Sequence, residues 1–506
     1  MNLTRLLVPY FVRRSRSCIN AAIDAENVQK RTLARLIAAG RNTIWGQTHR
    51  YDKIQGYKDF SECHPVEPYD VLRPYIMRMI AGEKNILWPG TTRRFAQSSG
   101  TSDGKSKYIP ITDAALRLNH YYGASCSLAM YLDTHRGSHI FDGKSFILGG
   151  SYANELALDN KKTKVGDLSA TLIDCVNPLV NMVRVPSKKT ALLADWHEKL
   201  PALVRESAKA NVTNISGVPS WFLTVLRSIL AESRASSIHD VWPNLEVFFH
   251  GGISFAPYRD EYRSITDRGR MNYWENYNAS EGFFSAQHEP DNPAMLLLTD
   301  AGVFYEFIPA DNPAAPPKPV WEVEKGKKYS LVITSCNGLW RFPIGDVVKI
   351  ESLSPVTLTI AGRTKSYINA FGEEVMVHNT DAALAAACRA CRCSVKDYTV
   401  APVYTSGASK GHHQWLIEFS HEPDDMELFS ATLDKCLCDE NSDYQAKRTG
   451  SIFLARLTIA SARPGLFDTW LESTGKLGGQ RKVPRLSNDR KIIEKMLELN
   501  QPSTKI

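Results

Sequence analysis

The sequence predicts an α/β protein with a large N-terminal domain and a smaller C-terminal domain. Three observations predict this. The chain has 506 residues, whereas single hydrophobic cores stop growing at about 250–300 residues. Short apolar runs bounded by glycine or proline alternate with segments of helical periodicity, as in α/β proteins. This alternation stops at residues 361–365 and then starts again, which predicts a domain boundary there.

The predicted large domain covers residues 1–362. Leu33, Leu36 and Ile37 share one face of a helix, and Gly40 is a suitable residue to end it. Apolar runs rich in β-branched and aromatic residues predict strands further along. These predicted strands are residues 245–249, 296–298, 303–308, 329–334 and 356–360.

The predicted small domain covers residues 363–506, about 140 residues, which is a usual domain size. It begins with a short strand and continues as alternating helices and strands. The predicted strands are residues 366–368, 398–403, 415–419 and 452–457, and the predicted helices are residues 381–390 and 426–436.

Composition favours an ordinary globular protein, with 43% hydrophobic and 23% charged residues. The net charge is +7, and Arg13, Arg14 and Arg16 form the densest basic run. We therefore expect no nucleic-acid partner.

The apolar run at residues 6–12 contains Pro9 and precedes the arginines, which is the wrong order for a secretory signal. No stretch approaches the roughly 20 apolar residues of a membrane span. We expect a cytoplasmic protein without membrane contact.

The chain has ten cysteines, which we expect to be reduced thiols in the cytosol. Cys388, Cys391 and Cys393, followed by Cys436 and Cys438, resemble half of a zinc site. A second C-x-x-C pair is missing, and an alanine-rich helix with small buried thiols explains the cluster equally simply. We prefer this second interpretation, although the sequence leaves metal binding open.

The segment SSGTSDGKSK, residues 98–107, has the composition of a phosphate-binding loop. Hydroxyl groups can donate to phosphate oxygens, glycines let backbone N–H groups turn inward, and lysine adds positive charge. The same composition is common in flexible surface loops. The candidate phosphate-binding residues are Ser98, Ser99, Gly100, Thr101 and Lys107.

A Walker loop is the obvious alternative for this segment, and its spacing argues against that class. The Walker motif has four residues between its glycines, whereas three separate Gly100 from Gly104. A Walker loop also opens directly into a helix, but residues 108–111 favour a strand. We predict that the loop joins two strands and that the next helix begins near Thr112 as its N-cap.

The segment YNASE, residues 277–281, follows in an aromatic stretch. Tyr277 could stack on a nucleotide base, and the Ser280 hydroxyl could contact a phosphate. Glu281 could hold Mg²⁺, which prefers carboxylate oxygens. The alternative is an ordinary strand and turn with a solvated Glu281.

Two further segments surround the predicted boundary. In WRFPIGDVV, residues 340–348, Pro343 and Gly345 predict a tight turn that presents Asp346 to ribose hydroxyls, although a turn aspartate often bonds only its own backbone. In GRTKSYINAFGEEV, residues 362–375, Arg363 is a candidate nucleotide-binding residue, although it could equally be a solvated linker cation.

The order and spacing of these segments resemble the acyl-adenylate-forming superfamily, which includes acyl-CoA synthetases and luciferase. They resemble more closely the auxin-responsive acyl-acid amido synthetases, the Gretchen Hagen family. That family also has a late Gln-x-Lys-x-Pro-Arg motif, present here as Gln480, Lys482, Pro484 and Arg485. The resemblance covers residues 87–486. Its third motif, Tyr-Arg-x-Gly-Asp, is longer by one residue here, so Asp346 is carried over and Arg341 is not.

The resemblance implies a large adenylate-forming domain of mixed sheets flanked by helices, with a small β-barrel. It also implies a mobile C-terminal domain that pivots near Lys365 and carries the catalytic Lys482. ATP and a carboxylic acid would give an acyl-AMP and pyrophosphate, with Mg²⁺ on the catalytic Glu281. An amine, typically an amino acid in this family, would then take the acyl group.

Two other functions remain open from the sequence. One is an acyl-CoA ligase, in which a thiolate replaces the amine. The other is a non-catalytic nucleotide-binding protein. The sequence assigns neither the acid, the amine and the acyl-pocket residues, nor the oligomeric state.

Overall fold

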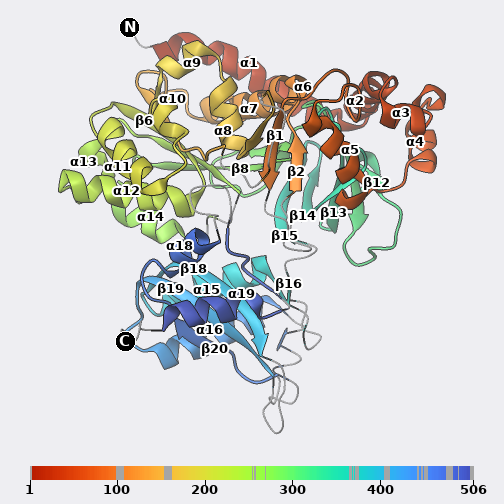
Figure 1. Ribbon diagram of the computed structural model, residues 1–506. Helices are drawn as coiled ribbons and strands as arrows, with labels where there is room; N and C mark the ends of the chain where they lie inside the picture. The colour runs from red at the N-terminus through yellow and green to blue at the C-terminus, as the bar shows by residue number, and fades with distance from the viewer. Residues whose placement is uncertain are drawn as a thin grey trace.

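The computed structural model describes most of the chain as two bodies, one above the other in Figure 1. The described residues are 3–98, 107–152, 156, 162–252, 255, 258–267, 269–363, 367–368, 370, 375–403, 411–441, 444–445, 448, 454–474, 482–487 and 489–501. The larger body carries the red-to-green N-terminal part, and the smaller carries the blue C-terminal part. This confirms the predicted α/β class with a large and a small domain. The boundary between residues 362 and 363 stays a prediction.

A 12-stranded sheet forms the centre of the large domain, in the order β12-β11-β13-β14-β15-β10-β9-β8-β7-β6-β3-β5. Its parallel half consists of β3 (Lys144–Ile147), β5 (Arg184–Val185), β6 (Val212–Gly217), β7 (Val247–Gly251) and β8 (Asn272–Ala279). Its antiparallel half consists of β9 (Gly282–Gln287), β10 (Met295–Leu297), β11 (Val303–Pro309), β12 (Lys318–Pro319), β13 (Lys328–Ser335), β14 (Phe342–Leu353) and β15 (Val356–Arg363). The small β-barrel implied by the resemblance stays a prediction, because these strands belong to one 12-stranded sheet.

Helices cover both faces of the parallel half, as parallel sheets require. One face packs against α1 and α7, where Val12 and Met130 meet Trp274 of β8. The other face packs against α11 to α14, where Phe222 and Tyr262 meet Phe248 of β7. The helices of the large domain are α1 (Leu3–Ile23), α2 (Ala25–Gly40), α3 (Ile44–Thr48), α4 (Tyr57–Cys63), α5 (Tyr69–Ala81), α6 (Asp113–Ala115), α7 (Tyr121–Thr134), α8 (Leu168–Cys175), α9 (Pro178–Met182), α10 (Lys188–Ala191), α11 (Trp196–Ser207), α12 (Pro219–Ser233), α13 (Ile238–Val241) and α14 (Arg259–Ile265).

The small domain is a three-stranded sheet with helices on both faces. Strand β19 (His412–His421) lies between antiparallel β18 (Ser394–Val403) and parallel β20 (Thr458–Ser461). Helices α15 (Val377–Ala390) and α16 (Met426–Glu440) pack on one face. Helices α18 (Leu466–Ser473) and α19 (Lys491–Asn500) pack on the other. Strands β16 (Tyr367–Ile368) and β17 (Val375–Met376) form a separate pair.

Two local predictions were wrong. Gly40 is the last residue of α2 and the C-cap is Arg41 in right-handed helical conformation. A Cβ on Gly40 would lie 2.5 Å from the Trp340 ring, so close packing rather than a cap requires this glycine. The strand predicted at residues 452–457 is also misplaced, because the strand in this region begins at Thr458.

No helix in the described part of the chain combines the length and the apolar character that crossing a membrane would need.

Candidate active site

The carboxyl ends of the parallel strands form the edge at which the sequence motifs meet. In open α/β sheets, ligands bind outside these ends. Strands β6, β7 and β8 end here at Gly217, Gly251 and Ala279, and α12 starts directly after β6 at Pro219.

The predicted phosphate loop joins two antiparallel strands at this site. Strand β1 (Arg94–Ser98) pairs with β2 (Lys107–Pro110), and Ser98 lies opposite Lys107. Helix α6 begins after Thr112, whose hydroxyl accepts from the Ala115 N–H at 2.9 Å. The strand–loop–strand prediction and the Thr112 cap are therefore confirmed, and the Walker alternative is excluded. Residues 99–106, which include Ser99, Gly100 and Thr101, lie outside the described residues, as does the Ser98 side chain.

Lys107 extends from β2 toward the antiparallel half of the large sheet. Its Nζ lies 5.7 Å from the ring centroids of both Tyr69 and Phe342. Phe342 is the first residue of β14, the strand that carries Asp346. The lysine of the phosphate loop therefore lies beside the strand of the predicted ribose-binding residue.

The YNASE motif is the end of β8 and a buried hairpin turn. Ala279 pairs with Gly282 of β9, so Ser280 and Glu281 form the turn. Each is only 7% exposed, although turn residues usually lie at the surface. The Asn337 side chain donates to the Glu281 carbonyl at 3.0 Å. The alternative of a solvated Glu281 was therefore wrong.

Tyr277 and Asp346 contact each other directly. The Tyr277 hydroxyl donates to Asp346 Oδ2 at 2.7 Å, and each residue is 4% exposed. The Tyr277 ring also lies 5.0 Å from the Phe284 ring. The structure therefore brings together the residues predicted to contact the base and the ribose.

The tight turn predicted around Pro343 and Gly345 was wrong, because both residues lie inside β14. Val332 of β13 pairs with Pro343, while Ser330 pairs with Val347. The extra residues of β14 form a bulge, and Gly345 takes a φ of +90° in it. Such bulges re-aim side chains, and this one sets the direction of Asp346.

Asp346 lies directly opposite Arg363 across β14 and β15. This pairing brings the Arg363 backbone to the nucleotide-binding candidates, while its side chain lies outside the described part.

Arg341 lies in the core of the large domain rather than at the nucleotide-binding candidates. Its guanidinium forms a buried two-point ion pair with Glu306, at 2.7 and 3.0 Å. It is thus part of the core, in agreement with its omission from the predicted site.

Lys482 reaches the site from the small domain. Its Nζ donates to the carbonyl oxygen of Gly252, the residue that follows β7. Residues 475–481 lie outside the described residues, so the mobility expected from Gly475, Gly478 and Gly479 stays a prediction. Lys482 itself lies at the carboxyl edge of the parallel strands.

One buried and one partly buried titratable residue beside this contact, His250 and Glu275, have no sequence motif. His250 of β7 pairs with Glu275 of β8. Burial lowers the pKa of His250 to about 3 and raises the pKa of Glu275 to about 7. At neutral pH the imidazole is therefore uncharged. Only the position of His250 next to the end of β7 could have indicated it, because Glu275 lies in the middle of β8.

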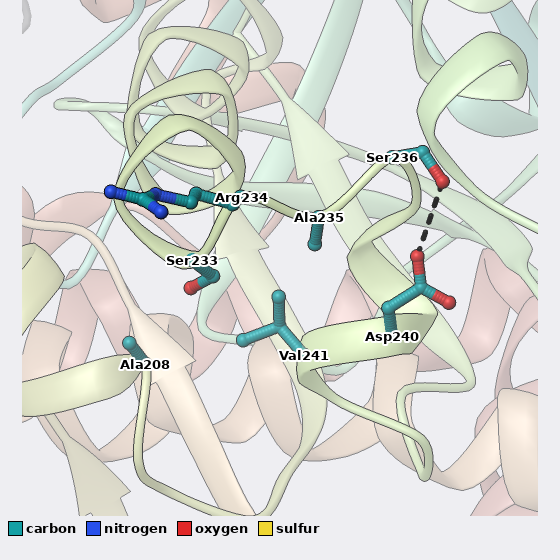
Figure 2. Close-up of a pocket in the computed structure, with 7 residues that line it drawn as sticks. All are labelled: Ala208, Ser233, Arg234, Ala235, Ser236, Asp240 and Val241. Carbon is teal, nitrogen blue, oxygen red and sulfur yellow. Dashed lines mark hydrogen bonds between the residues drawn. The ribbon is translucent and has the colours of Figure 1, made fainter.

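A surface pocket elsewhere is lined by residues near the ends of α11, α12 and α13 (Figure 2). There the Ser236 hydroxyl donates to Asp240 at 3.3 Å. Helix α12 starts at the carboxyl edge after β6 and leads back toward β7. Its last residue, Ser233, and the C-cap residue Arg234 therefore lie at the opposite, amino edge, away from the motifs.

No group of three or more His, Cys, Asp or Glu side chains in the described residues is arranged to hold a metal ion. The five cysteines near residues 388–438 are free thiols. They lie in or against the core between the small sheet, α15 and α16.

The site combines the loop between strands β1 and β2, the buried Tyr-x-x-Ser-Glu hairpin and a lysine from the small C-terminal domain. A solved 2-hydroxyisobutyryl-CoA ligase in the postadenylation state has this fold, with a TM-score of 0.55 and 12% identity over 97% of this chain and 91% of that chain.

Models of the three GH3 family domains match this chain: the N-terminal domain at residues 16–271, the central domain at 296–363 and the C-terminal domain at 378–491. The chain belongs to the GH3 family, which confirms the resemblance found in the sequence. The solved GH3.15 acyl acid amido synthetase has the same fold, with a TM-score of 0.77 and 18% identity over 96% of this chain and 95% of that chain.

Curated relatives match over nearly the whole length. Jasmonoyl–L-amino acid synthetase JAR6 from Nicotiana attenuata is 24% identical, over 91% of each chain. Indole-3-acetic acid-amido synthetase GH3.10 from Arabidopsis thaliana is 24% identical, over 93% of this chain and 94% of the relative.

Proposed function

We propose that this protein is an ATP-dependent acyl-acid amido synthetase that joins a carboxylic acid to an amine, an amino acid by analogy with the named relatives. The observation that carries the proposal is the contact of Lys482 with Gly252. It brings a cation from the small domain to the edge where the YNASE hairpin and the phosphate-loop strands also lie.

In the first half-reaction, a substrate carboxylate oxygen attacks the α-phosphorus of ATP. A P–O bond forms, the bond to pyrophosphate breaks, and acyl-AMP remains. The obstacle is repulsion between two anions, and prepositioned cations and N–H donors lower it. Lys107 and Lys482 supply positive charge, and the loop residues Ser98, Ser99, Gly100 and Thr101 donate to phosphate oxygens.

Residues of the large domain orient the nucleotide. Tyr277 lies against the adenine and Asp346 accepts from the ribose hydroxyls. The hydrogen bond between these two side chains fixes their relative positions before ATP binds. Ser280 contacts a phosphate, and Arg363, opposite Asp346 in the sheet, adds positive charge beside it.

Glu281 is the residue that would hold Mg²⁺. Proteins bind this ion with one or two carboxylates and leave its other positions to water and substrate phosphate. A single buried carboxylate in a rigid hairpin fits that requirement. When bound, the ion would neutralise phosphate charge.

In the second half-reaction, the amine nitrogen attacks the acyl carbonyl carbon. The amide C–N bond forms, AMP leaves, and the nitrogen loses a proton. We propose a small organic acid as the acyl substrate and a cytoplasmic site of action.

The test is carboxylate-dependent exchange of pyrophosphate into ATP, screened over aromatic, indolic and fatty acids. Products are then identified by mass spectrometry with amino acids or CoA added. Lys482→Ala should abolish exchange, whereas Lys495→Ala, on the exposed face of α19, should leave it unchanged. Near-normal exchange by Lys482→Ala would contradict the proposal, and a CoA thioester as product would favour an acyl-CoA ligase. ATP binding without exchange for any acid would favour a non-catalytic protein.

A further inference from the structure

Two side chains of one small-domain segment contact one loop of the large domain. Lys482 donates to the carbonyl of Gly252. Three residues later, the Arg485 guanidinium donates through Nη2 to the Tyr258 hydroxyl at 2.6 Å. Gly252 and Tyr258 lie at the two ends of the connection between β7 and α14. The two contacts therefore join the same pair of segments.

Arg485 is fixed within its own domain. Its Nη1 donates to Asp397 and, at 3.2 Å, to the carbonyl of Tyr398. Its guanidinium lies 4.4 Å from the centroid of the Tyr398 ring. The backbone carbonyl of Arg485 accepts from the Val400 N–H at 2.8 Å. The guanidinium therefore has one orientation relative to β18, and its contact with Tyr258 reports how the two domains are placed.

The residues between the two contacts are also anchored. Val483 is 4% exposed and packs in the core with α18 and α19. The carbonyl of Pro484 accepts from the Thr399 hydroxyl at 2.7 Å. Only the flexible Lys482 side chain then has to span the distance to Gly252. Any rotation of the small domain that breaks the Tyr258 contact moves Lys482 as well.

Tyr258 is suited to this role because it is rigid. It is 1% exposed and belongs to the core between β7 and α12 to α14. Its hydroxyl points out of that core toward the small domain. Trp221 of α12 also packs against the small domain, so the loss of one hydrogen bond weakens this orientation without abolishing it.

We propose that Tyr258 and Arg485 are a positioning pair that holds Lys482 at the carboxyl edge for the adenylation step. This inference rests on the proposed function. The pair contacts neither phosphate nor acid, and it acts through Lys482.

The first test compares Tyr258→Phe with Tyr262→Phe. Both remove a buried hydroxyl near α14, but the Tyr262 hydroxyl donates to Pro219 inside the large domain, at 2.7 Å. We expect Tyr258→Phe to lower the maximal rate of pyrophosphate exchange about tenfold, the scale of one hydrogen bond to a charged group. The KM for ATP should stay within about twofold, because the proposed contacts with the base, the ribose and the phosphate loop lie in the large domain and only Lys482 comes from the small one. Tyr262→Phe should change neither value.

A second test does not depend on activity. An amine-reactive acylating reagent is applied to the full-length protein, and labelling of Lys482 is followed by mass spectrometry. Tyr258→Phe should increase this labelling several-fold, and Tyr262→Phe should leave it at the wild-type level.

Unchanged Lys482 labelling in Tyr258→Phe would overturn the inference, even if exchange fell. An equal loss in exchange and in amide formation from preformed acyl-AMP would also overturn it, because the pair would then be merely structural. If the wild-type protein exchanges no pyrophosphate but its labelling responds as expected, the proposed function fails and the positioning contact stands.

Discussion

The Tyr277 hydroxyl donates to Asp346 at 2.7 Å, although three strands separate β8 from β14 in the sheet. Across a flat sheet, four strand spacings would put these strands about 19 Å apart. Two side chains of this size cannot bridge that distance, so the sheet must curl and bring its antiparallel half back toward β8. This curl makes one site from motifs 69 residues apart.

Removal of this hydrogen bond should weaken nucleotide binding. Tyr277→Phe leaves the buried Asp346 carboxylate without this donor, and a lost bond to a charged group costs about 1.5–3 kcal/mol. We expect the KM for ATP in pyrophosphate exchange to rise about tenfold to a hundredfold. Tyr329→Phe, which removes a hydroxyl of the neighbouring strand β13 that accepts from the Glu324 N–H rather than donating to Asp346, is the control. Equal KM values for the two variants would contradict the predicted role.

Local chemistry explains which parts of the site the sequence predicted. The spacing of Gly100 and Gly104 and the strand after Lys107 were enough to predict a loop between two strands, because turns and β-propensity are short-range properties. Tyr258 could not be predicted in the same way. Its partner Arg485 is 227 residues away, and their contact depends on how two separately folded domains dock.

The roles of Gly40 and Arg341 also could not be predicted from the sequence, because each depends on a partner far away in the chain. A glycine after an apolar helix usually marks a C-cap, but Gly40 is needed because Trp340 packs against it. From the sequence alone, a glycine that is required at a C-cap cannot be distinguished from a glycine that is required for close packing. Likewise, Arg341 precedes the Gly-Asp pair as in a binding motif, but its partner Glu306 lies in another strand.

Lys107, rather than Lys105, should act on the phosphates of ATP. Lys107 is in β2 opposite Ser98 and lies beside β14. Lys107→Met should lower kcat/KM for exchange about a hundredfold to a thousandfold, as expected when one charge-stabilising group is lost. Lys105→Met should change it less than about threefold. Steady-state kinetics of both variants check this, and a larger loss for Lys105→Met would reverse the assignment.

Arg341→Met should destabilise the protein because it leaves the buried Glu306 carboxylate without its counter-ion, although the Tyr57 hydroxyl still donates to it at 3.0 Å. Removal of one partner of a buried ion pair costs about 3–5 kcal/mol. The Arg456–Glu427 pair is a matched control, since its side chains are 43% and 75% exposed. Arg456→Met should cost less than about 1 kcal/mol. Urea unfolding measures the loss in the free energy of unfolding for both variants. Similar losses would show that the site around Glu306 can relax or take up water.

Glu275 should make stability depend on pH. Burial raises its pKa to about 7 from an ordinary value of 4.5, and the positive charge of Arg259 opposes this rise. Between these values the folded state keeps a proton that the unfolded state releases. The free energy of unfolding therefore falls as the pH rises through this window.

Glu275→Gln removes that dependence. Relative to wild type, it should gain about 2–3 kcal/mol of stability between pH 4.5 and pH 8, from about 1.4 kcal/mol for each pKa unit. Urea unfolding at several pH values measures the gain. Glu498→Gln, at an exposed site on α19, should show no such trend. A flat difference for Glu275→Gln would mean that the carboxyl is ionised in the folded state.

Gly252→Ala should separate backbone strain from the placement of Lys482. Gly252 has a φ of +80°, and a Cβ there would lie 3.2 Å from Lys482 Nζ. Gly326 has nearly the same φ, +82°, but no atom within 4 Å of its added Cβ. Alanine in this left-handed region costs about 1–2 kcal/mol, so both variants should lose similar stability in urea unfolding. Only Gly252→Ala should also lose pyrophosphate exchange, because its methyl group displaces the lysine from the carbonyl. Equal exchange by the two variants would mean that Lys482 reaches the phosphates without this contact.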